Sequence, residues 1–157
     1  NYWIHTGMEQ VDQEKMSKSL GNFFTIREVL ANYDAETTRF FLTTGQYRSQ
    51  LNYSTDNLEQ AKASLERIYT ALRDVEVIEN YQLDKANEFV NAFCQAMDDD
   101  FNTANGIAAL FELSSLANTY LMETHTEAKV LEGFMSTLKE LAGVLGIEMD
   151  IRFLFEA

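Results

Sequence analysis

The sequence predicts a mainly α protein, in which a short β/loop segment precedes an antiparallel helical bundle. Three observations support this fold class. Hydrophobic residues make up 46% of the 157 residues, which is enough for a sizeable core. The first 53 residues mix strand, turn and short-helix signals, whereas apolar residues recur at helical spacing from Ser54 onward. This change of pattern divides the chain into a segment of residues 1–53 and a helical domain of residues 54–157.

The first segment is predicted to open with a short strand or hairpin. Residues Tyr2–Val11 mix aromatic, β-branched and Gly residues, as strands do. The following run KMSKSLGN, residues 15–22, is polar and ends in Gly and Asn, which favour a turn. Thr25 and Glu28 then form a capping box, because each side chain can accept a hydrogen bond from a free backbone NH at a helix start. A short helix should therefore follow the loop.

A second short helix is predicted to begin after Asp34, a residue suited to capping a helix N-terminus. It should run through Leu42 and end at Gly45, because glycine commonly terminates helices. Its three consecutive apolar residues, Phe40, Phe41 and Leu42, are expected to form its buried side.

Four helices are predicted in the second domain. The first starts near Ser54–Asp56 and carries an apolar stripe at steps of 3, 4, 3 and 4 residues, formed by Leu58, Ala61, Leu65, Ile68 and Leu72. The others cover about residues 84–97, 103–122 and 126–145, and Gly146 is placed to end the last of them. Four such helices with short connections predict an antiparallel bundle.

The cysteine content and the hydropathy exclude several protein classes. Cys94 is the only cysteine, so an internal disulfide and a cysteine-rich zinc cluster are both impossible within this chain. Because Phe89, Val90, Phe93 and Met97 surround it in the pattern, we expect a buried core thiol. No apolar run approaches the roughly 20 residues that span a bilayer, and the opening residues lack the order of a signal peptide. These features predict a soluble, cytoplasmic protein.

The formal charge of -13 argues against a nucleic-acid partner, because phosphate contacts come from Lys and Arg. The charge is unevenly distributed, however. Residues 1–53 hold 5 basic and 6 acidic residues, a net of -1, and the remainder holds 7 basic and 19 acidic residues, a net of -12. Any surface that faces phosphate should therefore lie in the first third of the chain.

Two lysines of the polar loop indicate an anion-binding site. Lys15 and Lys18 lie three residues apart just before a helix start, so the loop can bend both ammonium groups toward one anion. Ser17, Ser19 and the free backbone NH groups beyond them add further donors. Phosphate is the natural ligand, and an exposed basic loop without a ligand is the alternative interpretation.

The string KMSKS, residues 15–19, resembles the second signature of class I aminoacyl-tRNA synthetases. Its flanks, from YWIHTGMEQ at residue 2 to LNYS at residue 54, are similar almost residue for residue to bacterial cysteinyl-tRNA synthetases. The run AMDDDFNTANGIAALFEL, residues 96–113, continues the match. The resemblance implies a mobile lid over ATP, followed by a helical tRNA-binding domain of the DALR type.

The resemblance also implies an activity and its residues. A cysteine-tRNA ligase activates cysteine with ATP and transfers it to tRNA(Cys). Lys18 would be the main contact to the charge that develops on pyrophosphate, with Lys15 in support and with Ser17 and Ser19 shaping the loop. ATP would bring Mg²⁺, whereas the family's zinc site and nucleotide-binding fold lie outside this segment, for which we predict no metal site. We therefore expect the 157-residue chain alone to be inactive.

Arg48 lies between the loop segment and the bundle, where the resemblance implies an approach to the inner bend of tRNA. It is a candidate phosphate contact, and an intramolecular salt bridge is the alternative. The consecutive residues Asp98–Asp100 could suggest a cation site, but their place before a helix favours capping and helix-start charges. His5 is expected to make a packing or polar contact rather than to bind a metal.

Two other functions stay open at this point. A ligase that joins cysteine to an amino sugar would use the same adenylating machinery without tRNA, although the long helical region after residue 54 favours the synthetase. A free-standing helical RNA-binding or scaffold module would belong to a different class altogether.

Overall fold

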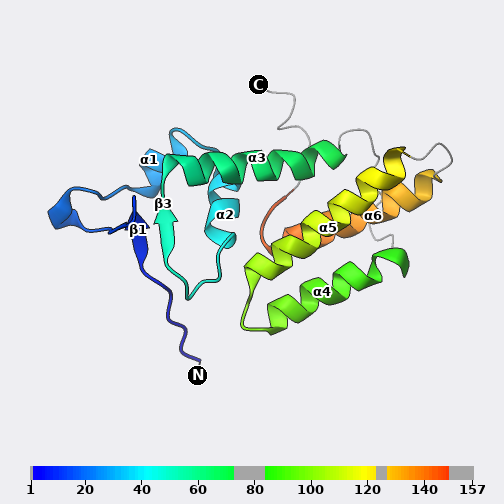
Figure 1. Ribbon diagram of the computed structural model, residues 1–157, viewed down its shortest axis with the longest axis horizontal. Coiled ribbons are helices and arrows are strands. Elements are labelled where there is room, and N and C mark those ends of the chain that lie inside the picture. The colour runs from blue at the N-terminus through cyan, green and yellow to red at the C-terminus, as the bar shows by residue number, and fades with distance from the viewer. Residues whose placement is uncertain (1, 73–83, 123–126, 149–157) are drawn as a thin grey trace.

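The computed structural model describes residues 2–72, 84–122 and 127–148, and this part of the chain is mainly helical (Figure 1). Its elements follow the predicted order, with strands and short helices before residue 54 and long helices after it. In chain order they are β1 (Glu9–Val11), β2 (Glu14–Lys15), the 3-10 turn η1 (Lys18–Leu20), α1 (Ile26–Leu30), α2 (Ala35–Thr43), β3 (Leu51–Tyr53), α3 (Thr55–Leu72), the 3-10 turn η2 (Asp84–Ala86), α4 (Asn87–Asp98), α5 (Thr103–Met122) and α6 (Ala128–Val144).

The three strands form one small sheet in the order β2-β1-β3. The hairpin β1–β2 is antiparallel and turns through Asp12 and Gln13, whose φ angles of 49° and 68° suit a two-residue hairpin. β3 pairs parallel to β1, with Glu9 opposite Leu51. The strand predicted within residues 2–11 thus occupies only its last three residues, and the segment that contains α1 and α2 connects the two parallel strands.

The predicted capping box at α1 is confirmed. Glu28 N donates to Thr25 Oγ1 at 3.2 Å, and Thr25 N donates to Glu28 Oε2 at 2.6 Å. The backbone NH of Thr25, and then its hydroxyl, lower the pKa of the Glu28 carboxyl below its ordinary value, because both groups donate to the charged form. This box fixes where the polar loop ends and the helix begins.

The N-cap of α2 is also confirmed, but its predicted buried side is partly wrong. Asp34 accepts hydrogen bonds from the backbone NH of Thr37 at 2.7 Å and from its hydroxyl at 2.6 Å. Phe40 and Phe41 are buried, whereas Leu42 is 52% exposed. Successive residues of an α-helix point about 100° apart, so three in a row span too wide an arc to share one buried side.

The long helices pack around α5. Helices α4 and α6 both contact α5, and α3 lies across α5 while it also packs on α2 (Figure 1). The predicted stripe of α3 is confirmed at its four described positions, which are all buried: Leu58, Ala61, Leu65 and Ile68. The side chain of Leu72 and the predicted helix start at residue 126 lie outside the described residues. Gly146 follows α6 at φ 72°, as expected for a glycine stop.

Cys94 is exposed, so the prediction of a core thiol is wrong. On α4 the buried side chains are Phe93 and Ala96. The Phe93 ring fills the contact with α5, where a Cβ added to Gly106 would come within 3.3 Å of it. Cys94 lies one step around the helix from Phe93 and therefore points out of this contact.

The helices of the described residues do not meet the requirements of a membrane span. None of those within residues 2–72, 84–122 and 127–148 combines the length and the hydropathy that crossing a bilayer requires.

Candidate functional site

The lysine-bearing loop projects from the β1–β2 hairpin, away from helices α4–α6 (Figure 1). Lys15 is the last residue of β2, and Lys18 is the first residue of the 3-10 turn η1. Both side chains are exposed, and neither forms a salt bridge within the described residues. The ammonium group of Lys18 lies 5.5 Å from the centroid of the Phe23 ring, a cation–π distance. Both ammonium groups are thus accessible to an anion.

The two serines of the loop contribute to its shape. Ser17 caps η1, since its Oγ accepts a hydrogen bond from Leu20 N at 3.2 Å. The Ser19 Oγ lies 3.2 Å from the Ser17 Oγ. Gly21 ends the turn at φ 70°, and its backbone NH donates to the Lys18 carbonyl at 3.3 Å. A left-handed φ of this kind favours glycine.

Asn22 also holds the loop, although the sequence indicated it only as a turn residue. Its Oδ1 accepts a hydrogen bond from Ser17 N at 2.9 Å, and its Nδ2 donates to the Lys15 carbonyl at 3.1 Å. One feature of the sequence could have indicated this role: a primary amide, which carries both a donor and an acceptor, stands directly after the Gly that ends the turn.

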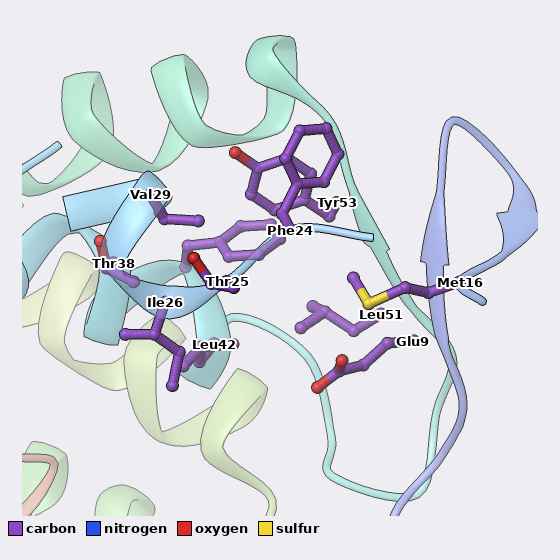
Figure 2. A pocket seen from close by; sticks show the side chains of 11 residues that line it. Glu9, Met16, Phe24, Thr25, Ile26, Val29, Thr38, Leu42, Leu51 and Tyr53 are labelled. Carbon is purple, nitrogen blue, oxygen red and sulfur yellow. The ribbon is translucent and has the colours of Figure 1, made fainter. Parts of the chain in front are cut away.

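Met16 faces an apolar pocket of about 100 Å³ between the hairpin and helices α1 and α2 (Figure 2). Leu51 and Glu9 line the side near Met16, and Ile26 and Leu42 line the opposite side. The lining is completed by Phe24, Thr25, Val29, Thr38, Phe41 and Tyr53. Met16 is only half-buried, so it contacts the body of the protein while the lysines on either side of it stay in solvent.

Phe24 connects the far end of the loop to β3. Its ring centroid lies 4.9 Å from that of Tyr53, and Tyr53 in turn meets the buried Phe41 edge-to-face at 6.3 Å. The loop is therefore held at both ends, by the hairpin ladder before it and by an aromatic contact after it.

Arg48 forms the intramolecular salt bridge that was one of its two predicted roles. Its Nη2 contacts the Asp100 Oδ2, and its Nε donates to the Tyr47 hydroxyl at 3.2 Å. The same carboxylate accepts from Tyr47 OH at 2.8 Å and from Gln46 Nε2 at 3.0 Å. The Tyr47 hydrogen bond, followed by Arg48, lowers the pKa of Asp100, and the contacts with Tyr47 and then with Asp100 raise the pKa of Arg48.

The interpretation of Asp98–Asp100 as caps is therefore wrong for Asp100. The side chain that caps α5 belongs to Asn102, whose Oδ1 accepts from Asn105 N at 3.1 Å. Asp98 is the last residue of α4, and Asp99 is its C-cap. Asp100 instead joins the α4–α5 connection to residues 46–48, with a partner more than 50 residues away that sequence spacing does not reveal.

His5 is exposed. Across residues 2–72, 84–122 and 127–148, His, Cys, Asp and Glu side chains nowhere gather in a group of three that could hold a metal ion.

Family models match the two parts of the chain. The model described as "tRNA synthetases class I (C) catalytic domain" matches residues 1–63, and the DALR domain model matches residues 92–150. The first match includes the lysine loop and the sheet, and the second includes most of α4–α6. These matches, together with the loop, place the chain in the class I aminoacyl-tRNA synthetases.

The relatives narrow the class to one family. The chain is 61% identical to the cysteine–tRNA ligase of Colwellia psychrerythraea over 149 residues, which are 94% of this chain and 32% of that protein. It is 54% identical to the cysteine–tRNA ligase of Shewanella woodyi over 157 residues, 99% of this chain and 33% of that protein. The chain belongs to the cysteine–tRNA ligase family, and it spans about one third of the length of these relatives.

A solved structure confirms the fold. The LeuRS of Agrobacterium radiobacter K84, in a ternary complex with tRNA and LeuAMS, superposes with a TM-score of 0.71. The match covers 97% of this chain and 22% of the LeuRS chain. Its 21% sequence identity makes this a likeness of fold alone.

Proposed function

We propose that the protein containing this chain is an ATP-dependent ligase that converts cysteine to cysteinyl-adenylate and transfers it to tRNA(Cys) in the cytoplasm. The chain contributes the ATP lid and a helical tRNA-binding region. The observation that carries the proposal is the exposed Lys15/Lys18 loop on a hairpin, in a chain 61% identical to a cysteine–tRNA ligase.

The loop lysines suit the adenylation step. The cysteine carboxylate attacks the α-phosphorus of ATP, an O–P bond forms, and the bond to the departing pyrophosphate breaks. Negative charge grows on the leaving group, and Lys18, supported by Lys15, stabilises it as a mobile point charge. The hydroxyls of Ser17 and Ser19 shape the loop. Mg²⁺ bound with ATP would neutralise further phosphate charge, and the family's zinc is assigned to residues outside this chain.

We assign the tRNA contact to Arg48, at the junction between lid and bundle. Its side chain is 60% exposed. Its described bonds use Nε and Nη2, so Nη1 is available to a phosphate oxygen without loss of the Asp100 contact. We further propose a functional division at residue 53, with residues 1–53 serving ATP and the approach to tRNA and residues 54–157 serving tRNA binding.

Cysteine-dependent exchange of labelled pyrophosphate into ATP by the full-length protein tests the activity. The expected result is exchange with cysteine well above that with serine, and no exchange by the 157-residue chain alone. A gel shift with tRNA(Cys) separates the synthetase from a ligase that joins cysteine to an amino sugar, because only the synthetase binds tRNA. Exchange without tRNA binding would favour the amino-sugar ligase, and tRNA binding without exchange would favour an RNA-binding module.

A further inference from the structure

The backbone of the loop leaves two polar groups on the outer edge of β2. In an antiparallel pair, hydrogen-bonded and non-hydrogen-bonded residue pairs alternate. Met16 N donates a hydrogen bond to Glu9 O at 3.2 Å, so Met16 and Glu9 form a hydrogen-bonded pair. Lys15, which lies opposite Gln10, therefore directs its carbonyl away from β1. The carbonyl of Lys15 and the NH of Ser17 thus face the same open edge.

The side chain of Asn22 occupies this edge. Its amide donates to Lys15 O at 3.1 Å and accepts from Ser17 N at 2.9 Å, as the peptide group of a third strand would. The Asn22 side chain thereby connects the end of the loop, at residue 22, to its start at Lys15 and Ser17. We call this pair of hydrogen bonds the Asn22 clasp.

We propose that Asn22 is the positioning residue that sets the separation of Lys15 and Lys18, through the clasp on the Lys15 carbonyl and the Ser17 amide. The first bond acts directly on the residue that carries one ammonium group. The second acts through Ser17, which caps the turn that Lys18 begins. The inference rests on the proposed adenylation role of the lysines and adds a residue that touches neither ATP nor cysteine.

The clasp would give the proposed ATP lid a defined shape. Beyond the hairpin ladder at its first end, the loop contacts the body through the half-buried Met16 and through Phe24. A loop whose two ends are joined to each other can move as one unit about these contacts, with the spacing of its two lysines preserved. Catalysis by positioned charges requires such preservation, because misplacement by about 1 Å can lower a rate about 100-fold.

The test compares Asn22→Ala with Asn32→Ala in the full-length protein. Asn32 is the matched control, because it is exposed and its amide makes a single described bond, to Glu28 O at 3.0 Å, at the end of α1. Asn22→Ala should lower kcat of cysteine-dependent pyrophosphate exchange about 10- to 100-fold, with little change in KM for cysteine or in the unfolding temperature. Asn32→Ala should leave all three near the wild-type values.

A second measurement does not depend on activity. Trypsin cleavage after Lys15 and Lys18, identified from the masses of the fragments, should accelerate about tenfold in Asn22→Ala, since two hydrogen bonds that close the loop are lost. Absence of exchange in the wild-type protein would refute the proposed function, while the trypsin comparison would still decide whether the clasp orders the loop.

Asn22→Asp separates the two bonds, because the carboxylate still accepts from Ser17 N but no longer donates to Lys15 O. The proposal requires this variant to be impaired as well. It is overturned if Asn22→Asp keeps the wild-type kcat, if Asn22→Ala keeps the wild-type kcat and cleavage rate, or if kcat, KM for cysteine and unfolding temperature all deteriorate together.

Discussion

The segment that carries the lysine loop, residues 2–53, and the helical region that follows it are built in opposite ways. Of the 14 large hydrophobic side chains that are exposed in the described residues, ten precede residue 43 and four follow it. The largest fully buried side chains show the reverse distribution, and α5 and α6 supply half of them. The charges also differ, with a net of -1 before residue 54 and -12 after it. The loosely packed first segment carries Lys15 and Lys18, and the densely packed acidic helices hold that segment in place through the packing of α3 on α2.

The largest expected effect is on the chemistry proposed for the lysine loop. Lys18→Ala in the full-length protein should lower the rate of adenylate formation about 10²- to 10³-fold, because the lost contact is to charge that develops in the transition state. Cysteine binding should change little. Single-turnover adenylate formation and cysteine titration measure the two quantities. Lys62→Ala, an exposed lysine on α3, is the control. Equal losses in rate and in cysteine binding would contradict the assigned role.

A truncation in the core of the helical region should lower stability rather than act directly on the chemistry of the loop. Leu110 on α5 is fully buried, so Leu110→Ala should lower the free energy of unfolding by about 3 kcal/mol through lost burial and the cavity that remains. Native-state hydrogen exchange of the α5 amides measures this loss. Leu121→Ala, at an exposed position of the same helix, should change it by less than about 0.5 kcal/mol. If Leu110→Ala loses cysteine-dependent pyrophosphate exchange while the α5 amides are still protected, the lysine loop and the helical region are coupled more tightly than their packing indicates.

Removal of the α2 cap should have a smaller effect, at the boundary between the two regions. Asp34→Ala removes the acceptor for the Thr37 backbone NH and should destabilise α2 by about 1 kcal/mol. Hydrogen exchange at α2 checks this value. Asp34→Asn, which keeps an acceptor, should recover most of it. Full loss in Asp34→Asn would indicate that charge at the helix start matters more than the hydrogen bond.

The smallest expected effect is a change in the pH dependence of stability. The pKa of Asp100 is lowered in the folded protein, first by the Tyr47 hydrogen bond and then by Arg48. A carboxyl of this kind stabilises the fold above its unfolded pKa of about 3.9 and loses that contribution as the pH falls through the lower folded pKa. Asp100→Asn should therefore be less stable than wild type at pH 7, and the gap should narrow below about pH 4.

Urea denaturation across this pH range measures the gap, with the exposed Asp98→Asn as the matched control. A gap that stays constant with pH would assign the stabilisation to the shape of the α4–α5 connection rather than to the Asp100 charge.

Local signals in the sequence predicted most of the secondary structure. The capping box at Thr25 and the cap at Asp34 act over three residues, so the sequence contains everything that determines them. The stripe of α3 was equally readable, because its spacing matches the helical repeat. The lysines of the loop were recognisable for a related reason, since their short spacing and polar neighbours indicate an anion site.

Contacts between distant segments escaped prediction. Residue type did not show that Leu42 and Cys94 point outward, because burial depends on which neighbour a helix meets. The partners of Asp100 lie 52 to 54 residues earlier in the chain, and no local pattern links them. Asn22 was noted for its turn propensity, and the hydrogen bonds of its side chain became evident only from the fold.

The parallel pairing of β1 with β3 has a consequence for synthesis of the chain. Glu9 pairs with Leu51, so Glu9 emerges from the ribosome 42 residues before its partner in the strand that completes the sheet. At about 5–20 residues per second, this delay lasts about 2–8 s. Throughout that interval β1 has one open edge, of the kind that attracts other extended chains. A hairpin whose two strands contain only five residues limits the hazard, because so short an edge offers few backbone groups to a competing strand.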